Sequence, residues 1–307
     1  MTKILITPRS LKTADHPALT PLREAGYEIF IPTPGVSPDV ATLKKVLPGC
    51  DGWLAGVEKI PAEAIAAADR LKIISRNGVG VDNVDLEAAK AKGIEVANTP
   101  GSNARGVAEL ALGLIFAVAR NIPLSAASIK AGGWDRVQGI ELQGKTLGVV
   151  GTGQIGRLLA TMASGIGMDT LGYDLYPDPT LIIPGFSYAG LEELVEKADV
   201  ISLHIPGGDK PLVDADFLSR ARRNLILVNT ARASAVDADA VLKSLDAGGM
   251  FGYGVDAFDP EPPGVTPLTS HPRVVCTSHI GAFTTESVMR AASQAAENIV
   301  KKLSGTR

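Results

Sequence analysis

Short apolar runs rich in β-branched residues alternate along the chain with Ala- and charge-rich segments of helical length. This alternation is typical of βαβ units, which build parallel sheets covered by helices. A long Ala- and Leu-rich helix, expected from about Ser102 as its cap to Arg120, separates two sets of strands. The first set is 3–7, 27–31, 52–55, 72–75 and 95–98, and the second is 146–150, 170–173, 200–204, 225–229, 252–256 and 274–277. We therefore expect an α/β fold of two doubly wound parallel-sheet lobes.

Composition and length exclude several classes of protein. The chain has 307 residues, enough for two domains, and its net charge of −3 lacks the basic excess of nucleic-acid binders. Its longest apolar stretch, 107–119, is shorter than the roughly 20 residues that cross a bilayer, and residues 1–7 are too short for a signal peptide. Cys50 and Cys276 provide neither a disulfide framework nor a metal site. We expect a cytoplasmic protein with no metal, nucleic-acid partner or membrane partner.

A glycine-rich motif follows the expected strand 146–150 and precedes the helical segment 157–164. It reads Gly151-Thr152-Gly153-Gln154-Ile155-Gly156. The first glycine permits a tight turn, the second lets the backbone approach a pyrophosphate, and the third permits close packing of helix on strand. The diphosphate then faces the N-terminus of the helix. We expect these six residues to bind a dinucleotide; the alternative is a Gly-rich turn in an unrelated α/β protein.

Two further residues at strand ends point to the same cofactor. Asp174 lies 18 positions beyond Gly156, where an acidic residue binds the ribose hydroxyls. Its charge repels a 2′-phosphate, and residues 175–177 offer no cation to hold one. This favours NAD over NADP, unless Asp174 is only a solvated loop acid. His204 ends the expected strand 200–204 and either borders the cofactor or is a structural histidine.

Three polar residues follow separate strands of the second set, where the carboxyl ends of an open sheet line the ligand crevice. His279 is a candidate general acid and base, since moving a hydroxyl proton needs such a group. The planar guanidinium of Arg232 suits a carboxylate. Glu261 lies in a loop stiffened by prolines. Taken singly, each has a plain alternative: a capping or core histidine, a surface ion pair and a loop acid.

Together with several other stretches, these residues give the chain a marked likeness to a known family. The stretches are 76–85, 98–101, 107–109, 149–156, 229–232, 256–263 and 277–281. The chain resembles the D-isomer-specific 2-hydroxyacid dehydrogenase family, and within it the short, phosphoglycerate dehydrogenase-like members. The resemblance implies an NAD-dependent oxidoreductase that interconverts a D-2-hydroxy acid and its 2-keto acid by hydride transfer.

The resemblance also implies a role for each matching polar residue. Arg232 would anchor the substrate carboxylate, His279 would act as acid and base, and Glu261 would be its partner. The backbone amides of Gly78 and Val79 would receive the substrate carboxylate. The resemblance places Asp256 near the nicotinamide carboxamide, and we assign Thr230 and Gly281 to the cofactor site as well. Arg76 lies just past the end of an expected strand of the first set, so it is a candidate for contact with the substrate or a phosphate; an ordinary ion pair is the alternative.

The same resemblance implies a domain division and a partner. Residues 1–99 would form a flavodoxin-like substrate-binding domain completed by the C-terminal helix 282–307. Residues 100–281 would form a Rossmann NAD-binding domain, with a cleft between the two. The segment after the interlobe helix would form a homodimer.

Three alternatives for the function stay open. A 3-phosphoglycerate-like substrate is one, although loop 54–58 lacks an arginine that phosphate-binding relatives place there. A formate or phosphite dehydrogenase relative is another, and Glu261 argues against it. The third is a non-catalytic, NADH-sensing corepressor-like protein, which would bind NADH without oxidising it.

Overall fold

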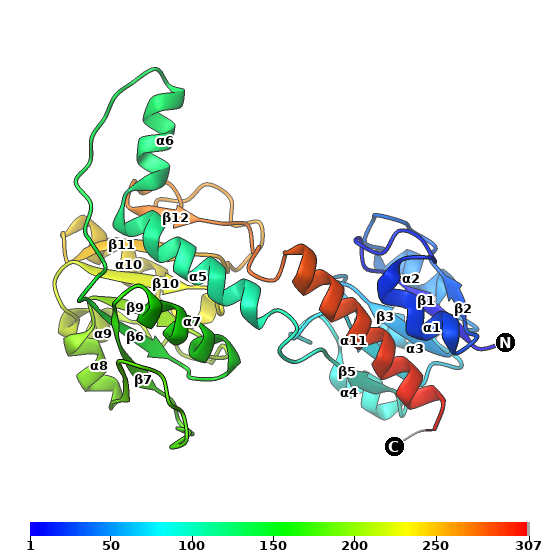
Figure 1. Cartoon of the computed structure of the whole chain (residues 1–307). Helices are drawn as coiled ribbons and strands as arrows, with labels where there is room; N and C mark the ends of the chain where they lie inside the picture. Colours follow the sequence, from blue (N-terminus) through cyan, green and yellow to red (C-terminus); the bar gives the residue numbers. More distant parts are fainter. Residues whose placement is uncertain (306–307) are drawn as a thin grey trace. The chain divides into compact units, whose positions relative to one another are not determined.

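The chain divides into two units, each with its own parallel sheet (Figure 1). The structure is a computed structural model and describes residues 1–305. Unit 1 comprises Met1–Asn103 and Ala282–Arg307, and unit 2 comprises Ala104–Gly281. Both sheets are entirely parallel. The expected α/β class, with two doubly wound sheets, is confirmed.

Unit 1 contains a five-stranded sheet in the order β2-β1-β3-β4-β5, which is the flavodoxin-like order. The strands are β1 (Lys3–Ile6), β2 (Glu28–Phe30), β3 (Gly52–Ala55), β4 (Ile73–Arg76) and β5 (Glu95–Ala97). The helices are α1 (Thr20–Glu24), α2 (Val40–Val46), α3 (Ala62–Ala67), α4 (Leu86–Ala91) and α11 (Thr285–Leu303).

Two apolar clusters, one on each face, hold helices to this sheet. Residues of α2, α3 and α4 share one cluster with Leu5, Trp53 and Ile74. Residues of α1 and α11 share the other with Ile4, Leu54 and Ile73. Helix α11 buries alanines at helical spacing, so its backbone packs close to the sheet. The C-terminal segment therefore belongs to the unit formed by the N-terminal residues.

Unit 2 contains a seven-stranded sheet in the order β12-β11-β10-β9-β6-β7-β8, a Rossmann order extended by one strand. The strands are β6 (Thr146–Val150), β7 (Asp169–Tyr173), β8 (Phe186–Tyr188), β9 (Val200–Leu203), β10 (Leu225–Asn229), β11 (Met250–Val255) and β12 (Val274–Cys276). The helices are α5 (Ala104–Ala119), α6 (Ile122–Lys130), α7 (Gln154–Gly165), α8 (Leu191–Lys197), α9 (Ala215–Arg220) and α10 (Ala238–Asp246).

Helix α5 is the main core helix of unit 2. Nine of its residues are buried, and it contacts α7, β10 and β11. Within residues 1–305, no single helix is long and apolar enough to cross a membrane, and only the bent pair α5 and α6, at 66°, meets the length and composition limits together. Six of the buried residues of α5, from Ala108 to Ala119, pack in an apolar cluster of this unit.

Two details differ from the sequence-based expectation. Strand β8 was not expected, because it has only three residues, none fully buried, at the edge of the sheet. Ser102 was expected to cap the long helix, but α5 begins at Ala104 and the Ser102 hydroxyl donates to the Thr99 carbonyl at 2.9 Å. Asp85 caps α4, since its carboxylate accepts the Ala88 amide at 2.9 Å.

Candidate active site

The glycine turn between β6 and α7 is shaped by two steric limits. Gly151 has a φ of 94°, and a Cβ added there would lie 2.4 Å from the His204 carbonyl oxygen. A Cβ at Gly156 would lie 2.1 Å from the Gly151 carbonyl oxygen. Gly153 caps α7, and a Cβ there would meet nothing within 4 Å. The turn therefore leaves open backbone at a helix N-terminus, which fits the diphosphate of a dinucleotide.

Asp174 is held against this turn by hydrogen bonds. Its Oδ2 accepts the Thr152 amide at 2.7 Å and the Thr152 hydroxyl at 3.1 Å, and its Oδ1 accepts the Tyr176 amide at 3.0 Å. Burial would raise the pKa of Asp174, but these hydrogen bonds outweigh it and lower the pKa overall. The nearby cation, Arg157, pairs with Asp178 at 3.0 Å. A firmly ionised carboxylate at this position suits ribose hydroxyls and disfavours a 2′-phosphate.

His204 is a half-buried residue beside the turn, and its ring nitrogen Nδ1 is fully buried. Its Nε2 lies 3.0 Å from the Ser202 hydroxyl, and its Nδ1 has no hydrogen-bond partner among the described residues. Burial lowers the pKa of His204 to about 4, so the imidazole is neutral at physiological pH. The His204 carbonyl lies against Gly151, so His204 is next to the glycine turn.

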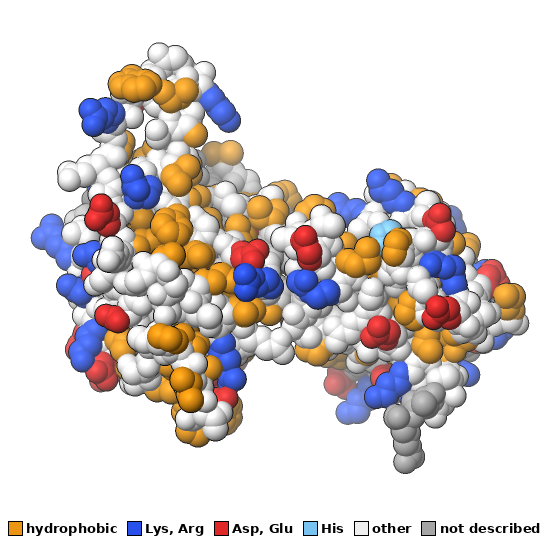
Figure 2. Space-filling view, viewed as in Figure 1, with side chains coloured by type: hydrophobic (Ala, Val, Ile, Leu, Met, Phe, Trp, Pro, Cys, Tyr) orange, Lys and Arg blue, Asp and Glu red, His pale blue; other side chains and the backbone are white. Residues whose placement is uncertain are grey.

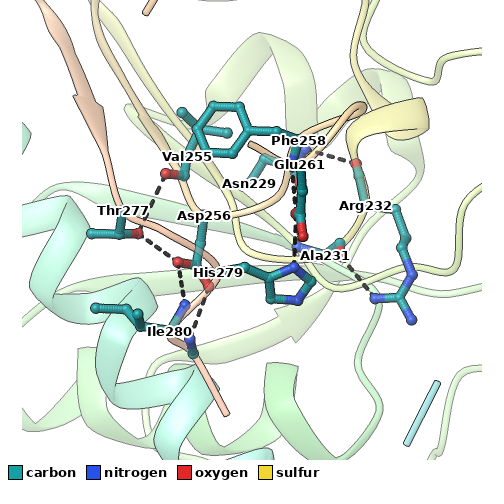
Figure 3. A network of polar contacts seen from close by, with 11 residues as sticks. Asn229, Ala231, Arg232, Val255, Asp256, Phe258, Glu261, Thr277, His279 and Ile280 are labelled. Carbon is teal, nitrogen blue, oxygen red and sulfur yellow. Dashed lines mark hydrogen bonds and ion pairs between the residues drawn. The ribbon is translucent and has the colours of Figure 1, made fainter. Parts of the chain in front are cut away.

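His279 and Glu261 form a pair at the carboxyl end of the sheet (Figure 3). His279 Nδ1 lies 2.8 Å from Glu261 Oε1, and the same oxygen accepts the Phe258 amide at 3.1 Å. The two side chains are 51% and 41% exposed, so the pair is open to a ligand. Because Nδ1 faces the carboxylate, Nε2 is the nitrogen available for proton exchange.

Asp256, which follows β11, holds the loop that carries His279. The Asp256 side chain is buried; its Oδ1 accepts the Thr277 hydroxyl at 2.6 Å and the Ile280 amide at 2.8 Å, and its Oδ2 accepts the Gly281 amide at 2.9 Å. His279 sits in this loop with a φ of 53°, a left-handed conformation that is uncommon outside glycine. Sequence reasoning assigned Asp256 and Gly281 to the cofactor and missed this positioning role, which depends on backbone amides.

Arg232 follows β10 in a loop organised by Asn229. Asn229 Nδ2 donates to the Arg232 carbonyl at 2.8 Å, and Asn229 Oδ1 accepts the Ala231 amide at 3.0 Å. Arg232 Nη1 in turn donates to the Ala231 carbonyl at 2.9 Å. The Thr230 hydroxyl is buried and has no hydrogen-bond partner among the described residues. Sequence reasoning missed the role of Asn229.

The substrate residues predicted from the first half of the chain lie together in unit 1. Gly78 has a φ of 151° and lies two residues after Arg76, the last residue of β4. The carbonyl of Val79 accepts the Asn98 side-chain amide at 2.7 Å, and the Gly78 carbonyl accepts the Thr99 amide at 3.1 Å. These contacts form within unit 1, as the contacts of His279, Glu261 and Arg232 described above form within unit 2.

The glycine turn, the acid after β7 and the sheet order define unit 2 as a dinucleotide-binding domain. Residues 112–281 match the family described as D-isomer specific 2-hydroxyacid dehydrogenase, NAD binding domain. The chain belongs to this family, and the expectations of family and of NAD as cofactor are confirmed.

Named relatives and solved structures agree with this membership. The chain is 42% identical over 253 residues to D-3-phosphoglycerate dehydrogenase of Methanocaldococcus jannaschii, covering 80% of this chain and 48% of the relative. It is 38% identical over 270 residues to hydroxypyruvate reductase of Thermotoga maritima, covering 85% and 87%. The crystal structure of the TT0316 protein from Thermus thermophilus has a TM-score of 0.88 at 39% identity, covering 99% and 97%. The chain spans about half the length of the phosphoglycerate dehydrogenases it matches.

Proposed function

We propose that the protein is an NAD-dependent oxidoreductase that interconverts a D-2-hydroxy acid and its 2-keto acid. The observation that carries this proposal is the contact of 2.8 Å between His279 and Glu261, at the same end of the sheet as the glycine turn. A small hydroxy or keto acid as substrate is supported by the family. The relatives named as phosphoglycerate dehydrogenase and hydroxypyruvate reductase keep a 3-phosphoglycerate-like substrate among the candidates.

The catalytic roles follow from the chemistry of the side chains. Bound NAD supplies the hydride acceptor, or NADH the hydride donor. His279 donates Nδ1–H to Glu261, so that Nε2 gives a proton to the substrate oxygen during reduction and takes it back during oxidation. Glu261 stabilises the charged imidazolium. Arg232 binds the substrate carboxylate through its planar guanidinium.

The other assigned residues bind the cofactor and the substrate. Gly151, Thr152, Gly153, Gln154, Ile155 and Gly156 hold the diphosphate, and Asp174, His204, Thr230, Asp256 and Gly281 complete the cofactor site. The amides of Gly78 and Val79, with Arg76, bind the substrate. On this assignment, residues 1–99 with 282–307 bind the substrate and residues 100–281 bind NAD.

A panel of 2-keto acids assayed with NADH tests the proposal. We expect NADH oxidation with at least one keto acid, and a large loss of kcat with unchanged NADH affinity in His279→Asn. Arg220→Lys, on the exposed face of α9, is the control and should keep the activity. Absence of turnover with the whole panel, while NADH still binds, would favour the NADH-sensing alternative.

We also propose a homodimer formed through α6 and the segment that follows it. Helix α6 has no buried residue, and Ile122, Ile129, Trp134 and Val137 are between 52% and 80% exposed. Figure 2 shows hydrophobic side chains on this projecting segment. Polar substitution of Ile129 and Trp134 should lower the molecular mass measured by light scattering.

We also propose that the protein is cytoplasmic. Its two cysteines, Cys50 and Cys276, are unpaired, as is usual in a reducing compartment.

A further inference from the structure

Glu58, in the loop after β3, is a buried acid that sequence reasoning did not single out. It is 4% exposed. Its Oε1 accepts the Gly56 amide at 2.9 Å and the Thr7 hydroxyl, which also accepts a hydrogen bond from Trp53 Nε1 at 2.9 Å. Its Oε2 is buried and has no hydrogen-bond partner among the described residues. A buried carboxylate with an unpaired oxygen is costly unless a positive charge lies near it.

Arg76 provides that positive charge. Arg76 Nε donates to Asn83 Oδ1 at 3.1 Å, and Asn83 Nδ2 donates to the Glu58 carbonyl at 2.7 Å, so one network joins the arginine to the Glu58 loop. Burial lowers the pKa of Arg76, and the negative charges of Glu58 and Asp82 oppose this shift. The Arg76 guanidinium is therefore joined to the Glu58 loop through Asn83, and the negative charge of Glu58 favours the charged form of Arg76.

The same guanidinium lies beside the backbone proposed to bind the substrate. A Cβ added at Gly78 would lie 3.2 Å from Arg76 Nη1. Any substrate whose carboxylate binds the Gly78 amide therefore meets a cation whose charge is already offset by a buried anion. Arg9, Lys12 and Lys59 are cations on the loops after β1 and β3; all three are exposed, so solvent and salt weaken their effect.

We propose that Glu58 is a specificity-determining residue, which offsets the charge of Arg76 so that the protein prefers 2-keto acids with an uncharged side chain over those with a second negative charge. The inference rests on the proposed function, because it concerns the substrate of that reaction. It gives a physical reason for discrimination against phosphorylated substrates that is independent of the missing arginine in loop 54–58.

The test compares hydroxypyruvate with its 3-phosphate ester, two keto acids that differ only in the phosphate group. With NADH, the wild-type protein should have the higher kcat/KM for hydroxypyruvate. Glu58→Gln removes the charge and keeps an oxygen that accepts the Gly56 amide, and it should move the ratio of the two kcat/KM values toward the phosphate ester about tenfold or more. Glu63→Gln, at an exposed position of α3, is the matched control and should leave the ratio unchanged.

A second variant separates the charge from the hydrogen bonds. Glu58→Met removes both. If the ratio of the two kcat/KM values shifts in the Met and Gln variants alike, the charge of Glu58 is the cause. If the ratio shifts in the Met variant alone, the cause is the support of the loop by hydrogen bonds, and the inference is overturned. An unchanged ratio in a folded Gln variant, or a wild-type preference for the phosphate ester, also overturns it. These outcomes require turnover of a keto acid, so they are distinct from failure of the proposed function, in which no keto acid is reduced.

Discussion

Burial of His204 predicts that unit 2 loses stability in mild acid. The pKa of His204 is lowered from 6.5 to about 4 by desolvation. Between these two values the unfolded chain binds a proton and the folded chain does not. Stability is therefore intact above pH 6.5, falls as the pH drops from 6.5 toward 4, and loses nothing further from this group below that range.

The magnitude follows from the two pKa values. At pH 5 the proton favours the unfolded state by RT ln[(1 + 10^1.5)/(1 + 10^−1)], which is about 2 kcal/mol, whereas at pH 7.5 the same expression gives less than about 0.1 kcal/mol. The difference is a large part of the roughly 5–15 kcal/mol that stabilises a typical domain.

Urea unfolding at pH 7.5 and pH 5.0 measures this difference. His204→Leu keeps an uncharged side chain in the site and should reduce the loss between the two pH values by about 2 kcal/mol relative to wild type. Ser202→Ala is the matched control: it removes the hydrogen bond to His204 Nε2 but leaves the imidazole buried, so it should keep the acid sensitivity. Equal losses in wild type and His204→Leu would refute the reasoning.

Three further predictions concern the cofactor turn and the loop of the catalytic histidine. Asp256→Asn should lower kcat by about tenfold or more at saturating substrate. The asparagine has one accepting oxygen in place of two, and a buried donor left unpaired costs about 1–3 kcal/mol. A wild-type kcat in this variant would contradict the positioning role of Asp256. Gly156→Ala should lower the melting temperature strongly, since its Cβ would lie 2.1 Å from a carbonyl oxygen, whereas Gly153→Ala should keep the melting temperature and raise the Kd for NADH measured by fluorescence. Asp174→Ser should raise the ratio of kcat/KM with NADPH to that with NADH by about tenfold, through loss of one negative charge, and an unchanged ratio would exclude Asp174 as the selecting residue.

Most of the fold could be predicted because parallel strands buried on both faces leave a strong apolar signal. Each expected strand of unit 1 and unit 2 coincides with an observed strand to within two residues at each end, and the bounds of β3, β6 and β10 are unchanged. Strand β8 was not predicted because its stability comes from pairing with β7 and not from an apolar pattern of its own. Its residues are half-buried or exposed.

The site could be predicted only as far as strand ends determine it. His279, Arg232 and Asp174 follow β12, β10 and β7, and this placement follows from the pattern of strands. Glu261 was expected as the partner of His279 from the family resemblance, but the backbone contacts that position these loops could not be predicted. Asp256 acts on backbone amides of a loop whose left-handed residue is a histidine, and a histidine adopts that conformation too rarely for its place in the sequence to mark the loop.

The same kind of hydrogen bond recurs where these loops leave the sheets. Asn229, Asp256, Asp174 and Glu58 each follow or end a strand and accept at least one backbone amide of the loop beyond or beside it. Each acceptor fixes backbone that would otherwise be free to move at the carboxyl end of the sheet, which is where ligands bind in such folds. Three of the four are carboxylates, so the side chain that holds the backbone in place also places a negative charge close to the ligand. The residues that set the shape of these loops therefore also set their electrostatic preference, and this is why isosteric replacement of an acid by its amide is the most informative substitution in this protein.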